Sequence, residues 1–321
     1  MNHIIFGASG FIGTHLVNII KEENPDAIIY NLDIIEENHD GKSLFIYCDI
    51  RQKIKLDIPV TSEDVIFNLA AVHRTPGHPD CEYFETNIYG AENVCTFANE
   101  YNIRKIIFTS SIAPYGASEN LKEETTLPTP NTPYGISKLI AEKTHQIWQA
   151  KDNTRELTIV RPGVVFGKGE NGNFTRLYWG VRKRSFIYAG RKDTIKACIY
   201  VKDLVYFMLY KLDNHKGGTD VYNCTYGPAY TIEQICNEML CITGLRRKII
   251  KIPGGLLMTA AFIVGLLGGK VLGIHPARVK KLMISTNISG KKLVSSGYSF
   301  KYTFHEALVD WYADNDNQFL Q

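Results

Sequence analysis

Short apolar runs alternate with longer amphipathic stretches along the first half of the chain. The apolar runs, which have the length of buried strands, cover residues 3–6, 27–33, 44–48, 65–69, 105–109 and 157–160. The clearest amphipathic stretches, which predict helices, cover 11–21, 83–101 and 134–150. Alternation of this kind predicts a parallel sheet covered by helices on both faces and joined by right-handed crossovers. We therefore expect an α/β fold with a doubly wound parallel sheet of the Rossmann type.

The pattern changes after Arg161-Pro162-Gly163. Glycine, aromatic and basic residues mix from this point, and the regular alternation of strand and helix is lost. A change of this kind predicts a second structural unit. The expected division is a main domain of 1–163 plus about 193–221, and a smaller C-terminal α+β lobe of 164–192 plus 222–321.

Composition fits an ordinary globular protein and excludes several classes of partner. The 321 residues carry a net charge of +3, and no long basic run interleaves with aromatic residues, so we expect no nucleic-acid partner. The seven cysteines form no C-x-x-C pair and no metal-like spacing with histidine, so we expect no metal site. This cysteine usage favours a reducing compartment. Because no secretory signal is visible after Met1, we expect a cytoplasmic protein.

Two charged or apolar segments each allow two interpretations. Arg182-Lys183-Arg184 either ends a helix in solvent or helps to attract an anionic substrate. Residues 253–269 contain no charge and are flanked by Lys251 and Lys270. This stretch is shorter than the ~20 residues of a spanning helix and is interrupted by glycines. It predicts either a buried helix of the smaller lobe or shallow contact with the inner face of a membrane.

A glycine-rich loop follows the first predicted strand and opens the first predicted helix. Its glycines are Gly7, Gly10 and Gly13. The first permits a tight turn, the second lets the backbone approach a pyrophosphate, and the third lets helix and strand pack closely. The helix then offers free N–H groups and partial positive charge to the phosphates. The residues expected to bind a dinucleotide here are Gly7, Ser9, Gly10, Phe11, Ile12 and Gly13.

Asp33 lies at the end of the second predicted strand, twenty residues past Gly13. Its carboxylate can accept hydrogen bonds from both hydroxyls of an adenosine ribose, and it would repel a 2′-phosphate. We therefore expect NAD rather than NADP, with an ordinary turn residue as the alternative interpretation of Asp33. After the third predicted strand, Asp49 and Ile50 are expected to border the adenine.

Tyr134 and Lys138 are four residues apart on a predicted helix, so the phenol and the ammonium lie on one face. A nearby positive charge favours the charged form of a phenol, and we expect Lys138 to lower the pKa of Tyr134. Such a tyrosine can act as a general base or acid on an alcohol. Ser110 and Ser111 supply hydroxyls at the end of an upstream apolar strand.

These motifs together resemble the extended short-chain dehydrogenase/reductase family, in its nucleotide-sugar epimerase branch. The matching residues, in family order, are Gly7–Gly13, Asp33, Asp49-Ile50, Asn68–Ala71, Asn87, Ser110-Ser111, Tyr134, Lys138, Arg161–Gly163 and Tyr200–Asp203. The resemblance implies that Ala70 and Ala71 pass under an NAD cofactor and that Asn87 supports it. It also implies that Ser111 is a catalytic hydroxyl and that Lys138 holds the nicotinamide ribose.

A narrower resemblance concerns the loop Ala70–Arg74 and the segments 277–282 and 295–298. They are similar to bacterial epimerases that invert C4 of N-acetylglucosamine on a polyprenyl diphosphate carrier in surface-polysaccharide assembly. Ile112-Ala113 replace the Asp-Glu pair with which dehydratases of the family eliminate water, so we do not expect dehydration. Val164 replaces an asparagine found in many nucleotide-sugar enzymes, which is compatible with another carrier.

The resemblance implies C4 epimerisation through a 4-keto sugar, with either UDP or a polyprenyl lipid as the carrier. A net NAD-dependent oxidoreductase, either a 4-keto-sugar reductase or an enzyme like hydroxysteroid dehydrogenases, would use the same residues and stays open. By family position, Arg278 and Asn173 are expected at the substrate phosphates. His73 and Arg74 follow a strand at the ligand-binding edge, where they could contact the substrate. Alternatively, His73 forms a structural hydrogen bond and Arg74 an exposed ion pair. Family members commonly pair through two helices of the main domain, so we expect a homodimer.

Overall fold

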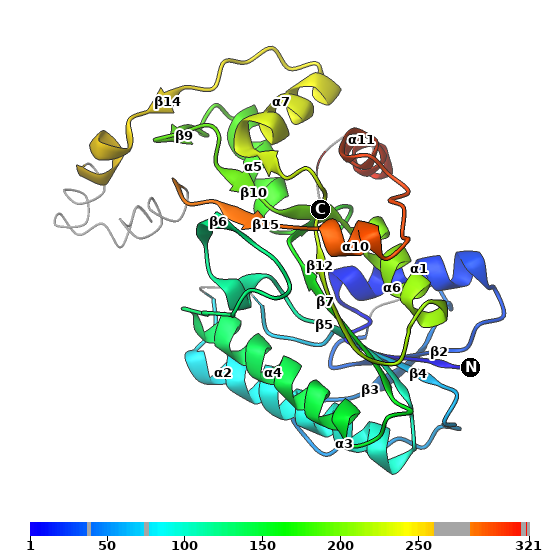
Figure 1. Ribbon diagram of the computed structural model, residues 1–321. Helices are drawn as coiled ribbons and strands as arrows, with labels where there is room; N and C mark the ends of the chain where they lie inside the picture. The colour runs from blue at the N-terminus through cyan, green and yellow to red at the C-terminus, as the bar shows by residue number, and fades with distance from the viewer. Residues whose placement is uncertain (37–39, 74–76, 260–282, 316–318, 320–321) are drawn as a thin grey trace.

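A seven-stranded parallel sheet forms the centre of the main domain in the computed structural model (Figure 1), which describes residues 1–36, 40–73, 77–259, 283–315 and 319. Its strand order is β12-β7-β5-β4-β1-β2-β3. The strands are β1 (His3–Phe6), β2 (Ile29–Asp33), β3 (Leu44–Tyr47), β4 (Val65–Asn68), β5 (Lys105–Thr109), β7 (Glu156–Pro162) and β12 (Gly218–Cys224). All neighbouring strands pair in parallel, which confirms the expected Rossmann-type sheet. The order reverses between β1 and β4, and ligands of such sheets bind at the carboxyl ends of the strands at this point.

Helices cover both faces of the sheet, and each face has its own hydrophobic core (Figure 1). The helices of one face are α1 (Phe11–Glu23) and α6 (Val201–Asp213), and those of the other are α3 (Gly90–Glu100) and α4 (Pro133–Ala150). Within β4, Val65 and Phe67 belong to the first core and Ile66 to the second, because successive strand residues point to opposite faces. Burial on both faces explains why these strands read as continuous apolar runs in the sequence.

The predicted helix over 83–101 is interrupted. It consists of α2 (Asp80–Phe84), a π-helical turn η1 (Glu85–Tyr89) and α3. A π turn inserts one residue into the helical repeat and often marks a functional position. Here it contains the buried Asn87, whose side chain bonds to residues outside the helix. Such distant partners are not visible in a local sequence pattern.

The smaller lobe combines short strands with helices, as expected. One mixed sheet has the order β13-β10-β15-β6, and two further strand pairs are β11 with β8 and β14 with β9. The strands are β6 (Ser118–Lys122), β8 (Val164–Phe166), β9 (Tyr188–Ala189), β10 (Ile195–Lys196), β11 (Cys198–Tyr200), β13 (Tyr230–Thr231), β14 (Lys251–Ile252) and β15 (Thr286–Ile288). The helices are α5 (Asn173–Arg182), α7 (Ile232–Thr243), α10 (Lys291–Ser295) and α11 (Phe304–Asp314). Aromatic side chains, Phe166, Phe174 and Trp311 among them, fill its core.

Four strands do not follow the division expected from the sequence. β10 and β11 lie within 193–221, which was expected in the main domain, but they pair with strands of the smaller lobe. β12 belongs to the main sheet along its whole length, so the expected boundary at 221 falls inside it. β6, from the first half of the chain, pairs with β15. The division into two units therefore stays a prediction.

The uncharged stretch 253–269 lies partly outside the described residues, because 260–282 are not among them. In the described part of the chain, no helix is both long and apolar enough to cross a membrane. The two interpretations of this stretch stay open.

Candidate active site

The glycine loop joins β1 to α1 and makes the close contacts that its sequence predicts. Gly7 has a φ of 85°, and a Cβ there would lie 2.7 Å from the backbone nitrogen of Ala70. A Cβ on Gly13 would lie 2.4 Å from the carbonyl oxygen of Gly7. Gly10 is exposed, and a Cβ there would meet only the Gly7 oxygen, at 3.3 Å. Close backbone packing therefore requires glycine at 7 and 13. At position 10 the missing side chain instead leaves room for a ligand to approach the loop.

The start of α1 suits an anion. Gly10 is the N-cap and provides no side-chain cap, and the first turn contains no acidic residue. The first N–H groups of a helix lack partners within the helix, so the amides of Phe11, Ile12 and Gly13 are suited to phosphate oxygens. The glycine contacts and the uncapped helix together fit the pyrophosphate of a dinucleotide.

Asp33 ends β2 directly beside this loop. Its Oδ2 accepts a hydrogen bond from the backbone N–H of Ser9 at 3.1 Å. Its Oδ1 accepts one from the N–H of Ile34 at 2.7 Å. Asn31 donates from Nδ2 to the Ser9 hydroxyl at 3.1 Å, which further fixes the loop. The carboxylate is thus held at the edge where a ribose bound behind the pyrophosphate would present its hydroxyls.

Asp49 and Ile50 follow β3 along the same edge. Arg51 forms a two-point ion pair with the Asp49 carboxylate, with Nη2 2.6 Å from Oδ2, and these hydrogen bonds lower the pKa of Asp49. Ile50 is buried, and its carbonyl accepts a hydrogen bond from Asn93 Nδ2 at 2.8 Å. An adenine amine at Asp49 would have to share the carboxylate with Arg51.

Asn87 ties the segment after β4 to α4. Its Oδ1 accepts from the N–H of Val72 at 2.9 Å, and its Nδ2 donates to the Val72 carbonyl at 3.1 Å and to Ser137 Oγ at 2.8 Å. Ala70 and Ala71 lie in the held segment, where the backbone meets Gly7. These bonds place Asn87 in a supporting position, and its role toward a cofactor stays a prediction.

Ser111 and Tyr134 are brought together by the way α4 begins. Thr132 caps the helix, with Oγ1 accepting from the N–H of Gly135 at 3.1 Å. Gly135 lets the first turn approach the segment that follows β5, because a Cβ there would lie 2.8 Å from the carbonyl oxygen of Ala113. Across this contact the Ser111 side chain, which accepts a hydrogen bond from the N–H of Ala113 at 3.1 Å, lies close enough to the Tyr134 phenol to affect its pKa.

Lys138 lies one turn further along α4 and is 2% exposed. Its Nζ is 4.5 Å from the centre of the Phe108 ring, a geometry that favours a cation over an aromatic face. His145 stacks on the same ring, with centroids 4.1 Å apart. Tyr134 and Lys138 are both on α4, four residues apart, so the predicted helix is confirmed and the two side chains share one of its faces.

The expected lowering of the Tyr134 pKa by Lys138 is wrong. Burial raises the pKa of Tyr134, and the opposite effect of the Ser111 side chain only partly offsets this. Burial also lowers the pKa of Lys138 to about 7, against the opposite effect of the Glu142 carboxylate. Removing both groups from water favours their neutral forms, an effect that the spacing of two residues in a sequence does not reveal.

A buried polar network next to Lys138 was missing from the predicted site. Glu142 and Arg161 are 1% and 5% exposed and form a two-point ion pair, with bonds of 2.8 Å from Nε and 2.6 Å from Nη2. Ser110 donates its hydroxyl to Oε1 of Glu142. Arg161 also donates from Nη1 to the Tyr115 hydroxyl at 2.6 Å, which donates to Asn223 Oδ1 at 3.0 Å.

This network connects the elements that carry the catalytic candidates. Ser110 precedes Ser111 at the end of β5, Glu142 lies one turn after Lys138 on α4, and Arg161 belongs to β7. The spacing of Glu142 from Lys138 repeats that of Lys138 from Tyr134, and this spacing could have identified it from the sequence.

The predicted substrate residues are only partly described. His73 and Asn173 are exposed, and Asn173 is the first residue of α5. Arg74 and Arg278 lie outside the described residues. The roles of these four residues therefore stay predictions.

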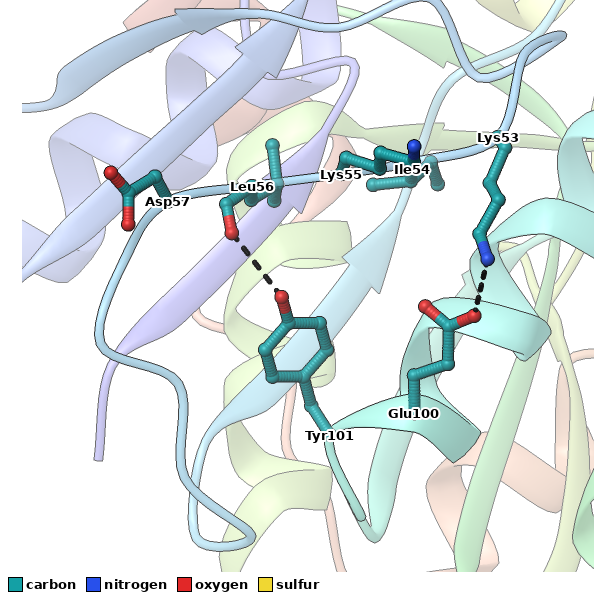
Figure 2. Close-up of a pocket in the computed structure, with 7 residues that line it drawn as sticks. All are labelled: Lys53, Ile54, Lys55, Leu56, Asp57, Glu100 and Tyr101. Atoms are coloured by element: carbon teal, nitrogen blue, oxygen red, sulfur yellow. Dashed lines mark hydrogen bonds and ion pairs between the residues drawn. The ribbon is translucent and has the colours of Figure 1, made fainter.

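A recess of about 420 Å³ lies away from these residues (Figure 2). It is lined by 53–57, which precede β4, and by Glu100 and Tyr101 at the end of α3. The Tyr101 hydroxyl donates to the Leu56 carbonyl at 3.2 Å, and Lys53 pairs with Glu100 at 2.9 Å. These segments precede β4 and β5, so the recess lies at the amino ends of the strands, whereas Ser111 follows the carboxyl end of β5. The recess and Ser111 are therefore at opposite edges of the sheet. Among the described residues, no group of His, Cys, Asp and Glu could hold a metal ion.

Comparison with known proteins gives a match over most of the chain. Residues 3–225 match the model of the NAD dependent epimerase/dehydratase family. N-acetyl-α-D-glucosaminyl-diphospho-ditrans,octacis-undecaprenol 4-epimerase of Escherichia coli O157:H7 is 33% identical over 313 residues, which cover 96% of this chain and 93% of that protein.

Solved structures are similar in fold at lower identity. UDP-glucose 4-epimerase of Thermotoga maritima, solved with UDP-glucose, is 21% identical with a TM-score of 0.75, over 99% of this chain and 100% of that one. UDP-glucuronic acid 4-epimerase of Bacillus cereus, solved with NAD, is 20% identical with a TM-score of 0.75, with the same coverage.

Proposed function

The chain belongs to the NAD dependent epimerase/dehydratase family as an NAD-dependent enzyme of the sugar 4-epimerase type, and we propose that it inverts C4 of a diphosphate-linked hexose or N-acetylhexosamine through a 4-keto intermediate. The observation that carries the proposal is the arrangement of Ser111 after β5 and of Tyr134 and the buried Lys138 on the first turns of α4. These groups follow β5 and open α4, at the carboxyl edge that also bears the glycine loop.

Each residue has a role that follows from its chemistry. NAD, held by the glycine loop and Asp33, supplies the hydride acceptor and donor when bound. Tyr134 removes the proton of the 4-hydroxyl as general base and returns it after inversion. Ser111 hydrogen-bonds O4 and orients it toward Tyr134. Lys138 would hold the nicotinamide ribose of bound NAD and, when protonated, would stabilise the phenolate.

We propose N-acetylglucosamine on a polyprenyl diphosphate as the substrate, in the assembly of a surface polysaccharide. The relative that acts on such a substrate, by its name, covers nearly the whole chain. Val164, in place of the asparagine of many nucleotide-sugar enzymes, supports a carrier other than a nucleotide. Ile112-Ala113, in place of the Asp-Glu pair of dehydratases, argue against dehydration. Arg278 and Asn173 are the proposed contacts of the diphosphate, because a diphosphate removed from water needs cations or amides. His73 and Arg74 are proposed as further substrate contacts.

The proposed location is the cytoplasm, at the inner face of the membrane that would hold this lipid. All seven cysteines are free, which supports a reducing compartment. The proposed assembly is a homodimer. An exposed apolar stripe on α4, formed by Ile136, Ile140 and Ile147, supports it.

The test is to incubate the purified protein separately with UDP-N-acetylglucosamine and with polyprenyl-diphospho-N-acetylglucosamine. Product stereochemistry and free NADH are then measured. Galacto product without net NADH supports the epimerase, and the substrate that turns over identifies the carrier. Accumulating NADH with a keto product would instead indicate a net oxidoreductase, and no turnover of either substrate would refute the assignment of this sugar.

A further inference from the structure

The end of the smaller lobe remote from the seven-stranded sheet has two basic segments beside each other (Figure 1). β9 and β14 pair in parallel, with Tyr188 opposite Lys251, and the Tyr188 N–H donates to the carbonyl of Ile250 at 2.9 Å. The segments that lead into these strands therefore approach side by side. Phe186 and Ile249, one from each segment, pack against the same hydrophobic cluster.

These segments carry Arg182-Lys183-Arg184 and Arg246-Arg247-Lys248, which we call the basic face. Five of the six side chains are exposed, and Arg247 is half-buried. In the part of the chain that the structure describes, none of them forms an ion pair with a carboxylate. The chain has 36 basic and 33 acidic residues, so without these six its net charge would be −3 instead of +3. The six charges of this face thus exceed the net positive charge of the whole chain.

Apolar side chains lie exposed next to this charge. The residues from 246 to 250 alternate between outward and inward positions, so Arg246, Lys248 and Ile250 face solvent while Ile249 packs inward. Ile250 and Leu256 are each 65% exposed. Basic residues combined with exposed large apolar side chains are typical of surfaces that bind the headgroup region of a bilayer.

We propose that the basic face docks on an anionic phospholipid bilayer. This inference rests on the proposed lipid-linked substrate, because an enzyme that acts on a polyprenyl diphosphate must work at a membrane surface. The basic side chains would be attracted to anionic headgroups, and Ile250 and Leu256 would enter the interfacial region. Such attraction is screened by salt.

The experiment measures co-sedimentation with vesicles that contain no sugar lipid, made of phosphatidylglycerol with phosphatidylcholine or of phosphatidylcholine alone. The triple variant Arg184→Gln, Arg246→Gln, Lys248→Gln removes three charges and spares Arg182 and Lys183, which both contact Trp179. At about fivefold per charge near an anionic surface, its partitioning should fall roughly a hundredfold. The matched control changes Lys55, Lys151 and Lys216, three exposed lysines elsewhere, to Gln.

Binding to phosphatidylglycerol that falls with salt and is lost only in the basic-face variant would support the proposal. Equal binding by both variants, or no binding by the wild type, would overturn it. Duplex DNA bound as tightly as the vesicles would overturn the lipid assignment in favour of a general polyanion surface. Because turnover of the sugar in detergent is measured separately, failure of the proposed function and failure of the docking surface give different results.

Discussion

The phenol of Tyr134 is the side chain on which the proposed chemistry depends most directly. In Tyr134→Phe the ring still packs on α4, but no group can remove the proton of the 4-hydroxyl. We expect kcat to fall by about 10²–10⁴, the usual contribution of a general acid or base. NAD binding, measured by titration of the cofactor-free protein, should change little, because the phosphate loop and Asp33 are intact.

Tyr101→Phe is the matched control for this variant. Tyr101 is also a partly buried tyrosine with a bonded hydroxyl, but it lines the recess at the other edge of the sheet (Figure 2). Its kcat should equal that of the wild type. Turnover of Tyr134→Phe within tenfold of the wild type would rule out Tyr134 as the base.

The Glu142 carboxylate determines how much positive charge Lys138 retains. Burial lowers the pKa of Lys138 to about 7, and Glu142 is the charge that raises it. Glu142→Gln should therefore move the pKa of Lys138 further below 7, which NMR titration of the lysine Nζ can measure. The same variant leaves Arg161 buried without its partner, so the free energy of unfolding should fall by about 3–5 kcal/mol.

A double variant separates these two effects. Glu142→Gln with Arg161→Met removes both charges of the buried pair, so most of the lost stability should return. The pKa of Lys138 should remain below that of the wild type, since the carboxylate is still absent. If the double variant restored the wild-type pKa, the effect of Glu142 on Lys138 would be structural rather than electrostatic.

The glycine loop shows how one element combines a folding role with a binding role. Gly13→Ala would put a Cβ 2.4 Å from backbone, which α1 cannot avoid without moving from β1. We expect a loss of about 1–3 kcal/mol in the free energy of unfolding. In Gly10→Ala the closest contact is 3.3 Å, so stability should be nearly unchanged. The methyl group would instead obstruct the pyrophosphate, and NAD affinity should fall about tenfold, equivalent to about 1.4 kcal/mol.

Thermal unfolding and NAD titration of these two variants check the separation. Gly255→Ala is the control, because a Cβ at that position meets nothing within 4 Å. Unchanged NAD affinity in Gly10→Ala would contradict the proposed approach of the phosphates.

The elements that the sequence predicted well are those set by local pattern. β1 and β5 have the predicted bounds, because double burial produces an unbroken apolar run. The π turn around Asn87 was not predicted. It occurs where Asn87 bonds to Val72 and Ser137, which are distant in the sequence and do not show in a local pattern. The pKa of Tyr134 was predicted in the wrong direction for a related reason, because desolvation depends on neighbours from distant parts of the chain.

At the scale of the whole molecule, the exposed apolar stripe of α4 is not explained by a single copy of the chain. Ile136, Ile140 and Ile147 are 37%, 40% and 60% exposed and lie on one side of the helix, at intervals of four and seven residues. Tyr89, at the end of η1, is also 56% exposed. A second copy that packed the same helices against these would bury both stripes, as a two-fold interface does.

Charge on this stripe should therefore separate the copies. Ile147 lies about two and a half turns from Lys138, so Ile147→Glu leaves the catalytic residues intact. It introduces a charge at the most exposed residue of the proposed interface. Sedimentation equilibrium should give twice the chain mass for the wild type and the chain mass for Ile147→Glu. Val309→Glu on α11, where the side chain is 41% exposed, should keep the mass of the wild type. A wild-type monomer at concentrations where the enzyme is active would exclude the dimer, and a dimer that persists in Ile147→Glu would mean that the copies pair through another surface.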